Sequence, residues 1–208
     1  MATHRDPTGA ATAPTERDRA KAERQDALLR GAARLFAAGG FDGVSLEDLG
    51  SAVGITGPAV YRHFASKRAL LGAILLRASE DLLAGGRHVL EGATDAGAQL
   101  RRLVDFHVEF ALADADVIRV QDRELAHLSD DDRHRVRRLQ REYVDLWIDV
   151  LQRVHPGRDR ADLRVRAHAG FGLINSTPYS VRALRDVPAD ADVHGILADM
   201  AVAALATP

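Results

Sequence analysis

Residues Ser45–Phe64, with the sequence SLEDLGSAVGITGPAVYRHF, decide the fold. Ser45 and Asp48 form a capping-box-like pattern, because the serine oxygen can accept a hydrogen bond from the backbone N–H three residues on and a carboxylate is favourable in the first turn of a helix. The helix that they begin has an apolar face that includes Leu49, and Gly54 is the residue type that ends a helix. This half of the stretch predicts one short helix.

A second short helix is expected after the glycine. Thr56 is a preferred N-cap, and Pro58 is tolerated in the first turn because its missing N–H has no partner there. Isolated helices of fewer than about 12 residues are marginal in water, so packing through Val60 and Phe64 must hold this one. Two helices with a glycine-containing turn predict a helix-turn-helix motif. The second helix exposes residue types that suit DNA, at Thr56, Gly57, Ala59, Tyr61 and Arg62.

The segment before this motif has two parts. Residues 1–15 are rich in Ala, Thr, Pro and Gly without apolar periodicity, which predicts a disordered arm. From residue 16 to about 38, apolar residues such as Leu28 and Phe36 recur at helical spacing, and Gly39-Gly40 ends the pattern. We expect one helix here, packed against the helix-turn-helix.

The segment after the motif has helical patterns only. Ser66 is a predicted N-cap, and Ser129 followed by three aspartates marks another helix start strongly. No alternating apolar run with turn dipeptides occurs, so we expect no sheet. The sequence therefore predicts an all-α fold of about nine helices. The later helices are expected at about residues 95–113, 116–128, 129–154, 160–176 and 190–206.

The composition excludes several classes of protein. The 208 residues include no cysteine, which excludes disulfides, thiolate zinc sites and cysteine nucleophiles. No apolar run approaches the roughly 20 residues that span a bilayer, and residues 1–14 lack the apolar core of a signal peptide. Residues 1–70 carry a net charge of +2 in a chain of net charge −2, which agrees weakly with a DNA-facing N-terminal end. We expect a cytoplasmic protein without a cofactor, a metal or a membrane partner.

Residues with a characteristic identity and spacing occur within the motif and on both sides of it. They are Leu35-Phe36, Gly40-Phe41, Ser45, Leu49-Gly50, Gly54-Ile55-Thr56, Val60-Tyr61-Arg62-His63-Phe64, Lys67 and Leu70-Leu71. At these positions the chain resembles the TetR family of transcriptional regulators, with one departure at Gly50, where the family usually has alanine. The resemblance covers about residues 16–83. It implies a three-helix DNA-binding domain over 16–83 and a helical ligand-binding and dimerisation domain over 84–208.

The resemblance also implies where DNA is bound. The start of the second helix would enter the major groove, Tyr61 and His63 would touch phosphate or base methyls, and Lys67 would bind the DNA backbone. A homodimer on an inverted-repeat operator is expected, because helix-turn-helix dimers place two recognition helices in successive major grooves about 34 Å apart. For Arg62 a solvated charge, and for His63 a packed helix end, are the alternatives. The predicted DNA-binding residues are Ser45, Thr56, Gly57, Pro58, Ala59, Tyr61, Arg62, His63 and Lys67.

The last helix, at about residues 190–206, is apolar and alanine-rich, so another part of the protein or a second subunit must bury it. In the TetR family the final two helices form a four-helix bundle between subunits, which favours a dimer surface here. Packing inside the same subunit is the alternative. The predicted interface residues are Val193, Ile196, Leu197, Met200 and Leu205.

The resemblance places a binding site for a small effector between about residues 87 and 185. Few aromatic and many aliphatic residues favour an acyl chain, so an acyl-CoA or a fatty acid is our hypothesis for this effector. Arg119 and Arg123, one helical turn apart, would receive an anionic head group. Plain core packing is the alternative for the aromatic residues. The candidate lining residues are Phe106, His107, Phe110, Arg119, Arg123, Tyr143, Trp147, Phe171, Asn175 and Tyr179.

Two other functions are alternatives to a regulator released by an effector. An enzyme is disfavoured because no HExxH, GxSxG, phosphate-loop or Rossmann pattern is present. The nine histidines are scattered, and we expect His127 and His134 to be solvated. A DNA-binding factor without an effector stays open. No residue distinguishes a repressor from an activator; a repressor is the prediction.

Overall fold

A computed structural model describes residues 15–52, 54, 60, 62–182 and 189–207, without the side chains of 17, 18, 20–24, 179, 182, 190 and 191. These residues form eight α-helices and one short 3₁₀ helix, with no strand among them. The all-α prediction is confirmed, and each expected later range holds a helix. The elements are α1 (Glu16–Gly39), α2 (Leu46–Ala52), α4 (Lys67–Leu90), α5 (Ala96–Ala113), α6 (Ala115–Glu124), η1 (Leu125–His127), α7 (Asp130–Val154), α8 (Arg160–Arg182) and α9 (Asp190–Ala206).

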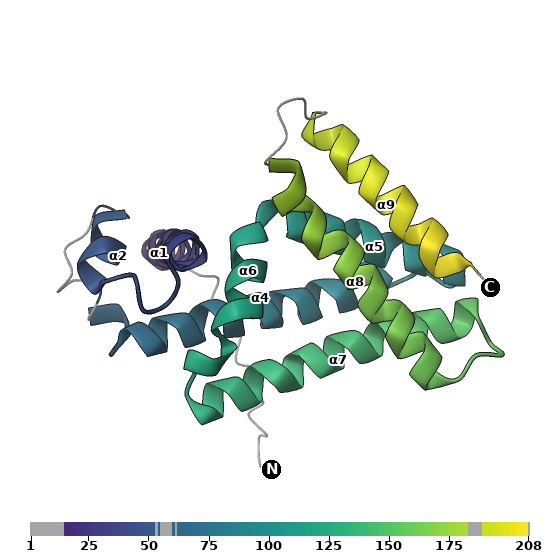
Figure 1. Ribbon diagram of the computed structural model, residues 1–208, viewed down its shortest axis with the longest axis horizontal. Helices are drawn as coiled ribbons and strands as arrows, with labels where there is room; N and C mark the ends of the chain where they lie inside the picture. Colours follow the sequence, from purple (N-terminus) through teal and green to yellow (C-terminus); the bar gives the residue numbers. More distant parts are fainter. Residues whose placement is uncertain (1–14, 53, 55–59, 61, 183–188, 208) are drawn as a thin grey trace, which may run out of the picture.

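The N-terminal helices α1 and α2 pack with the first half of α4 around one apolar cluster (Figure 1). Leu49 of α2 is fully buried in it, as the apolar face of the sequence requires. Val60 and Phe64 are also buried there, and the Phe64 N–H donates to the Val60 carbonyl at 2.9 Å. The predicted packing of the second short helix through this pair is therefore confirmed.

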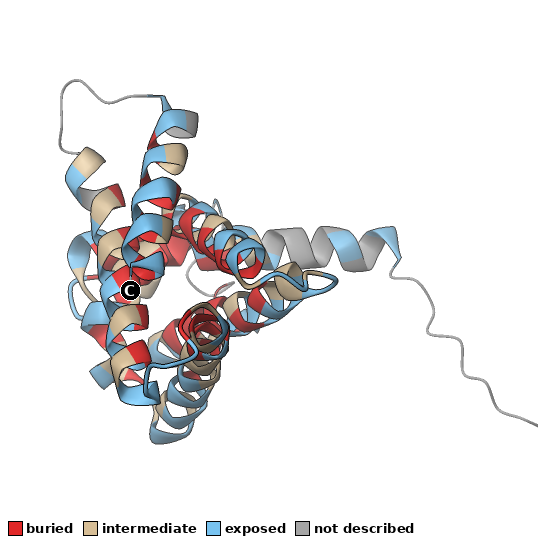
Figure 2. Ribbon diagram, turned by 90° about the vertical axis from the view of Figure 1, so that its right-hand side faces the viewer, coloured by how far each residue is buried: buried red, intermediate tan, exposed pale blue. Residues whose placement is uncertain are grey.

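The remaining helices enclose a second apolar cluster. The helix α7 packs along α4, while α5 lies between α4 and α9 and also contacts α8 (Figure 1). Trp147 is fully buried in this cluster. The two clusters divide within α4, because Ala78 belongs to the first and Leu83 to the second. The buried residues of Figure 2 accordingly line the inward faces of the helices.

The helix α6 connects the two parts of the molecule. It packs against α1 of the N-terminal part and also contacts α4, α5 and α8 (Figure 1). Its side chains divide accordingly: Val117 and Val120 belong to the N-terminal cluster, and Ile118 belongs to the second. A displacement of α6 therefore acts on both clusters.

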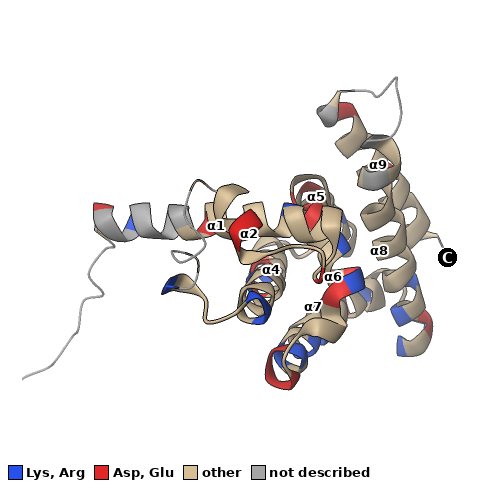
Figure 3. Cartoon of the chain, turned by 60° about the vertical axis from the view of Figure 1, so that its left-hand side comes forward, with Lys and Arg blue, Asp and Glu red and all other residues tan. Residues whose placement is uncertain are grey.

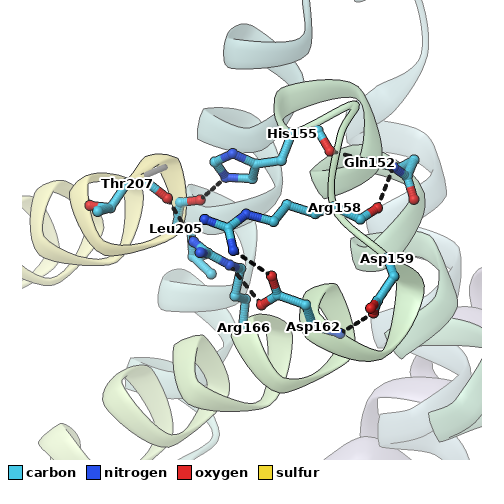
Figure 4. Close-up of polar contacts among 8 residues, drawn as sticks. All are labelled: Gln152, His155, Arg158, Asp159, Asp162, Arg166, Leu205 and Thr207. Carbon is cyan, nitrogen blue, oxygen red and sulfur yellow. Dashed lines mark hydrogen bonds and ion pairs between the residues drawn. The ribbon is translucent and has the colours of Figure 1, made fainter.

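The end of α9 is fixed to the turn between α7 and α8 (Figure 4). The His155 Nε2 atom lies 2.7 Å from the Leu205 carbonyl oxygen, and Arg166 donates to the Thr207 carbonyl at 2.6 Å. Asp162 holds Arg166 from the other side at 3.1 Å. These donors satisfy carbonyls that a helix C-terminus leaves without partners.

Candidate functional site

The start of α2 has the geometry of a capping box. The Ser45 hydroxyl oxygen accepts from the Asp48 N–H at 3.1 Å, and the Ser45 N–H donates to Asp48 Oδ2 at 2.9 Å. The Ser45 hydroxyl also donates to Asp48 Oδ2 at 2.7 Å, and this hydrogen bond, together with that from the Ser45 N–H, lowers the pKa of the Asp48 carboxyl. The cap fixes the direction in which the chain enters α2, so the role predicted for this pair in folding is confirmed. A DNA contact by Ser45 stays a prediction.

The second helix of the motif is described at three positions with helical backbone, Val60, Arg62 and His63. Val60 is fully buried, whereas Arg62 and His63 are exposed. Gly54, which ends α2, has a positive φ of 71°, the left-handed conformation that favours glycine. The predicted contacts at Thr56, Gly57, Pro58, Ala59 and Tyr61 lie outside the described residues.

Lys67 holds the turn between α1 and α2. Its ammonium group donates to the Phe41 carbonyl at 2.6 Å and to the Val44 carbonyl at 2.9 Å. The same group lies 4.5 Å from the centroid of the Phe41 ring, a cation–π contact. Because an ammonium has three protons, one is left for a phosphate. This structural role of Lys67 was not predicted from the sequence, and its phosphate contact stays a prediction.

The first turns of α2 and α4 carry opposite charge (Figure 3). The first turn of α2 is acidic, with Glu47 and Asp48. The first turn of α4 is basic, with Lys67 and Arg68. The start of α4 would therefore attract a DNA backbone more than the start of α2.

A cavity of about 730 Å³ lies between α4, α5, α6, α7 and α8. Its size is in the range of small-molecule sites. Exposed residues such as Arg123 and His168 form its rim, while Ile118 and Tyr143 are buried in its wall. The described residues that line it are Ser79, Leu82, His107, Phe110, Val117, Ile118, Arg119, Gln121, Asp122, Arg123, Leu139, Gln140, Tyr143, Val144, His168, Phe171, Gly172, Asn175 and Ser176.

Most of the predicted effector residues line this cavity, namely His107, Phe110, Arg119, Arg123, Tyr143, Phe171 and Asn175. Two predicted residues do not. Trp147 is fully buried behind the wall, with its ring 4.9 Å from that of Phe171. The Phe106 ring of α5 packs against Gly85 of α4, which has no side chain. Phe106 lines a different groove from that of the cavity. The side chain of Tyr179 lies outside the described residues.

A chain of hydrogen bonds crosses the wall of the cavity. The His107 Nδ1 atom lies 3.1 Å from the Tyr143 hydroxyl, and Nε2 lies 3.1 Å from Asn175 Oδ1. Burial lowers the pKa of His107 to about 4 and raises that of Tyr143, so both groups are neutral near pH 7. The three residues come from α5, α7 and α8 and tie these helices together.

Comparison with known proteins identifies the family. The model for bacterial regulatory proteins of the tetR family matches residues 28–74, and a tetracycline repressor-like C-terminal domain matches residues 93–179. The chain is 30% identical over 168 residues to the HTH-type transcriptional repressor KstR2 of Rhodococcus jostii strain RHA1, and the match covers 80% of this chain and 81% of the relative. The chain belongs to the TetR family.

Solved structures agree with this TetR-family assignment. A TetR-family transcriptional regulator from Bordetella parapertussis 12822 superposes with a TM-score of 0.76 at 27% identity, covering 87% of this chain and 93% of that one. The structure of AibR in complex with isovaleryl coenzyme A and operator DNA has a TM-score of 0.70 at 20% identity, covering 86% of this chain and 96% of that one. The second likeness shows the shared fold. As a TetR-family protein the chain is a DNA-binding transcriptional regulator and not an enzyme.

Some cavity residues of this TetR-family protein were missed by the sequence analysis. The helix α6 supplies Ile118 and Gln121 to the wall in addition to the two predicted arginines. Leu139 and Val144 of α7 also line the cavity. Helical spacing could have indicated Leu139, which lies one turn before Tyr143, because residues three or four apart on a helix lie near one another. Ile118, Gln121 and Val144 are only one or two positions from the nearest predicted residue, so this spacing does not indicate them.

The helix α9 corrects part of the predicted dimer interface. Val193, Leu197 and Leu205 are buried inside their own subunit, where they pack against the second apolar cluster. Ile196 and Met200, on the opposite face, are about half exposed, at 52% and 53%. The apolar surface that α9 leaves exposed is therefore narrower than its sequence suggests, and its use in a dimer stays a prediction. None of the helices that the structure describes is long and apolar enough to cross a membrane.

Proposed function

We propose that this TetR-family regulator is a repressor that binds an inverted-repeat operator as a homodimer and is released when a small hydrophobic effector fills the cavity. The effector class is an acyl-CoA or a free fatty acid. The observation that carries the proposal is the position of α6, which forms part of the cavity wall and also packs against α1.

The geometry of α6 supports a route from effector to DNA. Val117 lines the cavity and is also packed in the N-terminal apolar cluster, together with Val120. Protein interiors are close-packed, so a ligand that displaces this wall also displaces the helices on its far side. The helix on the far side is α1, which contacts α2 of the helix-turn-helix. An occupied cavity therefore changes the position of the DNA-binding helices.

The cavity suits an apolar effector with an anionic end. Its wall includes Leu82, Phe110 and Val144, and its volume of about 730 Å³ accommodates an acyl chain. Arg119 and Arg123 line it on one helix, and Arg123 is exposed at the rim. A carboxylate or phosphate at the rim would accept hydrogen bonds from these guanidinium groups. The bulky part of a coenzyme A thioester would then stay outside.

A homodimer agrees with the exposed apolar residues of the last two helices. Ile196 and Met200 on α9 and Val165 on α8 are the three large apolar side chains that are exposed among the described residues. Ala169, a small exposed residue one turn from Val165 on α8, allows close approach of another helix. We propose that the two-fold axis passes beside this surface.

The proposed DNA contacts are those that the family resemblance implies. They are Ser45, Thr56, Gly57, Pro58, Ala59, Tyr61, Arg62, His63 and Lys67. The exposure of Arg62 and His63 supports this assignment. Tyr61→Ala should weaken operator binding and leave helicity and dimerisation intact. Unchanged affinity would contradict the placement of the recognition helix.

The effector hypothesis is tested by thermal shift and by operator release. Acyl-CoAs and free fatty acids of 8 to 18 carbons, roughly the length range that such a cavity takes, are added to the protein and to its complex with a fluorescent operator. A ligand at 100 times its Kd should stabilise the protein by about 2.7 kcal/mol and should lower the anisotropy of the DNA. If no compound stabilises the protein, the hydrophobic effector is wrong. Stabilisation without release would favour a regulator whose DNA binding does not depend on the effector.

A further inference from the structure

The hydrogen-bonded chain of His107, Tyr143 and Asn175 lies in the wall of the cavity proposed above for the effector. His107 and Tyr143 are buried, at 4% and 5% exposure. Rings surround the imidazole, with centroids 5.0 Å away for Phe171 and 5.7 Å away for Trp147. The wall around His107 is therefore closely packed, unlike the rim.

Each hydrogen bond among His107, Tyr143 and Asn175 has a defined donor and a defined acceptor. A neutral imidazole has one N–H and one lone pair. Asn175 Oδ1 can only accept, so His107 Nε2 donates to it and Nδ1 accepts from the Tyr143 hydroxyl. Burial keeps His107 neutral by lowering its pKa to about 4, which preserves this arrangement near pH 7. Every proton of the chain is thereby assigned.

This polarity determines what Asn175 presents to the cavity. Its oxygen is held by His107, so the amide can turn over only if the imidazole changes tautomer and the Tyr143 hydroxyl turns as well. Its nitrogen carries two N–H donors, and no hydrogen bond from this nitrogen to another residue is found in the described part of the chain. Asn175 thus offers the cavity two N–H donors, while its oxygen is engaged by His107.

A saturated hydrocarbon chain is a poor match for such donors. It would displace water from the Asn175 amide without replacing the hydrogen bonds, and a buried donor without a partner is costly. A charged carboxylate is no better at this point, because none of the three residues of the chain is cationic near pH 7. A neutral oxygen accepts the hydrogen bond and needs no counter-charge.

We propose that the effector is an apolar molecule with a carbonyl or hydroxyl oxygen along its body, and that this oxygen accepts a hydrogen bond from the amide nitrogen of Asn175. The inference rests on the proposed function in that it takes this cavity as the effector site. It adds a specificity-determining residue and a ligand class, oxo- or hydroxy-substituted acyl compounds as opposed to plain saturated ones.

Matched ligand pairs test the inference. Dodecanoic acid is compared with oxododecanoic acids in which the carbonyl is moved stepwise along the chain. The fluorescence of Trp147, the one tryptophan of the protein, reports binding directly, because its ring packs against Phe171 of the cavity wall. At least one oxo isomer should bind about tenfold more tightly than dodecanoic acid, the gain expected from pairing one buried donor.

Substitutions of Asn175 and His107 test whether their hydrogen bonds cause the preference for an oxo-substituted ligand. Asn175→Leu should reduce the tenfold preference to about twofold or less, because no donor is left to pair. His107→Leu releases the amide to turn over and should weaken the preference without removing Asn175. Gln140→Leu is the matched control, since it removes a second amide from the same cavity. Whatever it does to overall affinity, the preference between the paired ligands should persist.

The outcomes separate this inference from the proposed function. Equal affinities for dodecanoic acid and every oxo isomer would overturn the inference and leave a hydrophobic effector in place. A preference that survives Asn175→Leu would overturn it as well, because another group then reads the oxygen. If no acid of any pair binds, the effector class proposed above fails together with the inference.

Discussion

The imidazole of His127 stacks on the phenyl ring of Phe41, with the ring centroids 4.7 Å apart and the planes at 24°. His127 ends the 3₁₀ helix that follows α6, and Phe41 lies in the turn between α1 and α2. The same imidazole has Nδ1 3.0 Å from Glu124 Oε2 and Nε2 3.6 Å from Asp42 Oδ2. His127 therefore joins the helix of the cavity wall directly to the turn that leads into the helix-turn-helix.

This contact predicts that His127→Ala lowers both the stability of the protein and the effect of the effector on operator affinity. The variant removes the ring stack and the imidazole that lies 3.0 Å from the carboxylate of Glu124, a residue that is 7% exposed. The free energy of unfolding should fall by about 1–2 kcal/mol in urea denaturation. The change in operator affinity caused by an effector should also shrink, because one connection between α6 and the helix-turn-helix is lost. His134→Ala, an exposed histidine of α7, is the control; equal behaviour of the two variants would contradict the coupling role.

The buried imidazole of His107 predicts how stability depends on pH. Its pKa is about 4 in the folded protein and 6.5 in a free chain, because burial disfavours the charged form. Between these values the unfolded chain binds a proton that the folded protein does not, so stability rises with pH across this window and is lost as pH falls from 6.5 to about 4. By pH 5 the loss from this residue is about 2 kcal/mol.

The variant His107→Gln checks this prediction, since it removes the titrating group and retains a polar side chain. It should be less stable than the natural protein at pH 7.5, and the difference should shrink by about 2 kcal/mol at pH 5. Urea denaturation at both pH values gives the numbers. Identical pH dependence in the two proteins would show that His107 is not the group responsible.

Much of this fold could be predicted from the sequence because its signals are local. Ser45 and Asp48, Gly54 and the aspartates after Ser129 define helix ends by their own hydrogen bonds and conformations. The predicted helix at 160–176 ended too early, however, because α8 continues to Arg182 and includes Pro178. Packing against neighbouring helices overrode the local propensity there.

What could not be predicted depends on contacts between distant residues. His127 was expected to be solvated, yet Phe41 and Glu124 partly cover it. On α9 the apolar residues lie all round the helix, so the sequence did not distinguish the buried Leu197 from the exposed Ile196. The hydrogen bond between His107 and Asn175 spans 68 positions, and no periodicity indicates such a pair.

The exposed apolar face of α9, with Ile196 and Met200, predicts that a charge introduced there prevents dimerisation. Ile196→Glu or Met200→Glu should convert the dimer to a monomer in sedimentation velocity, with helicity unchanged, because both side chains are exposed in the single subunit. A carboxylate in the centre of an apolar interface is costly without a partner. Ala84→Glu, at an exposed position of α4, is the control. A dimer that survives both α9 substitutions would place the interface elsewhere.

The two roles of Lys67 can be separated by salt. If its remaining proton contacts a phosphate, Lys67→Ala should reduce the slope of log affinity against log salt concentration by about 1 per protomer, nearly independently of DNA sequence. If Lys67 acts only by holding the Phe41 and Val44 carbonyls, affinity should fall with the slope unchanged. Anisotropy titrations at four salt concentrations decide between the two.

Selection of bound DNA from a random-sequence pool tests the central claim most directly, because that claim is a pair of recognition helices presented by a symmetric dimer. The account predicts an enriched inverted repeat, with half-site centres separated by a whole number of helical turns of about 10 bp. Recovery of no common sequence, or of a single half-site without two-fold symmetry, would contradict it.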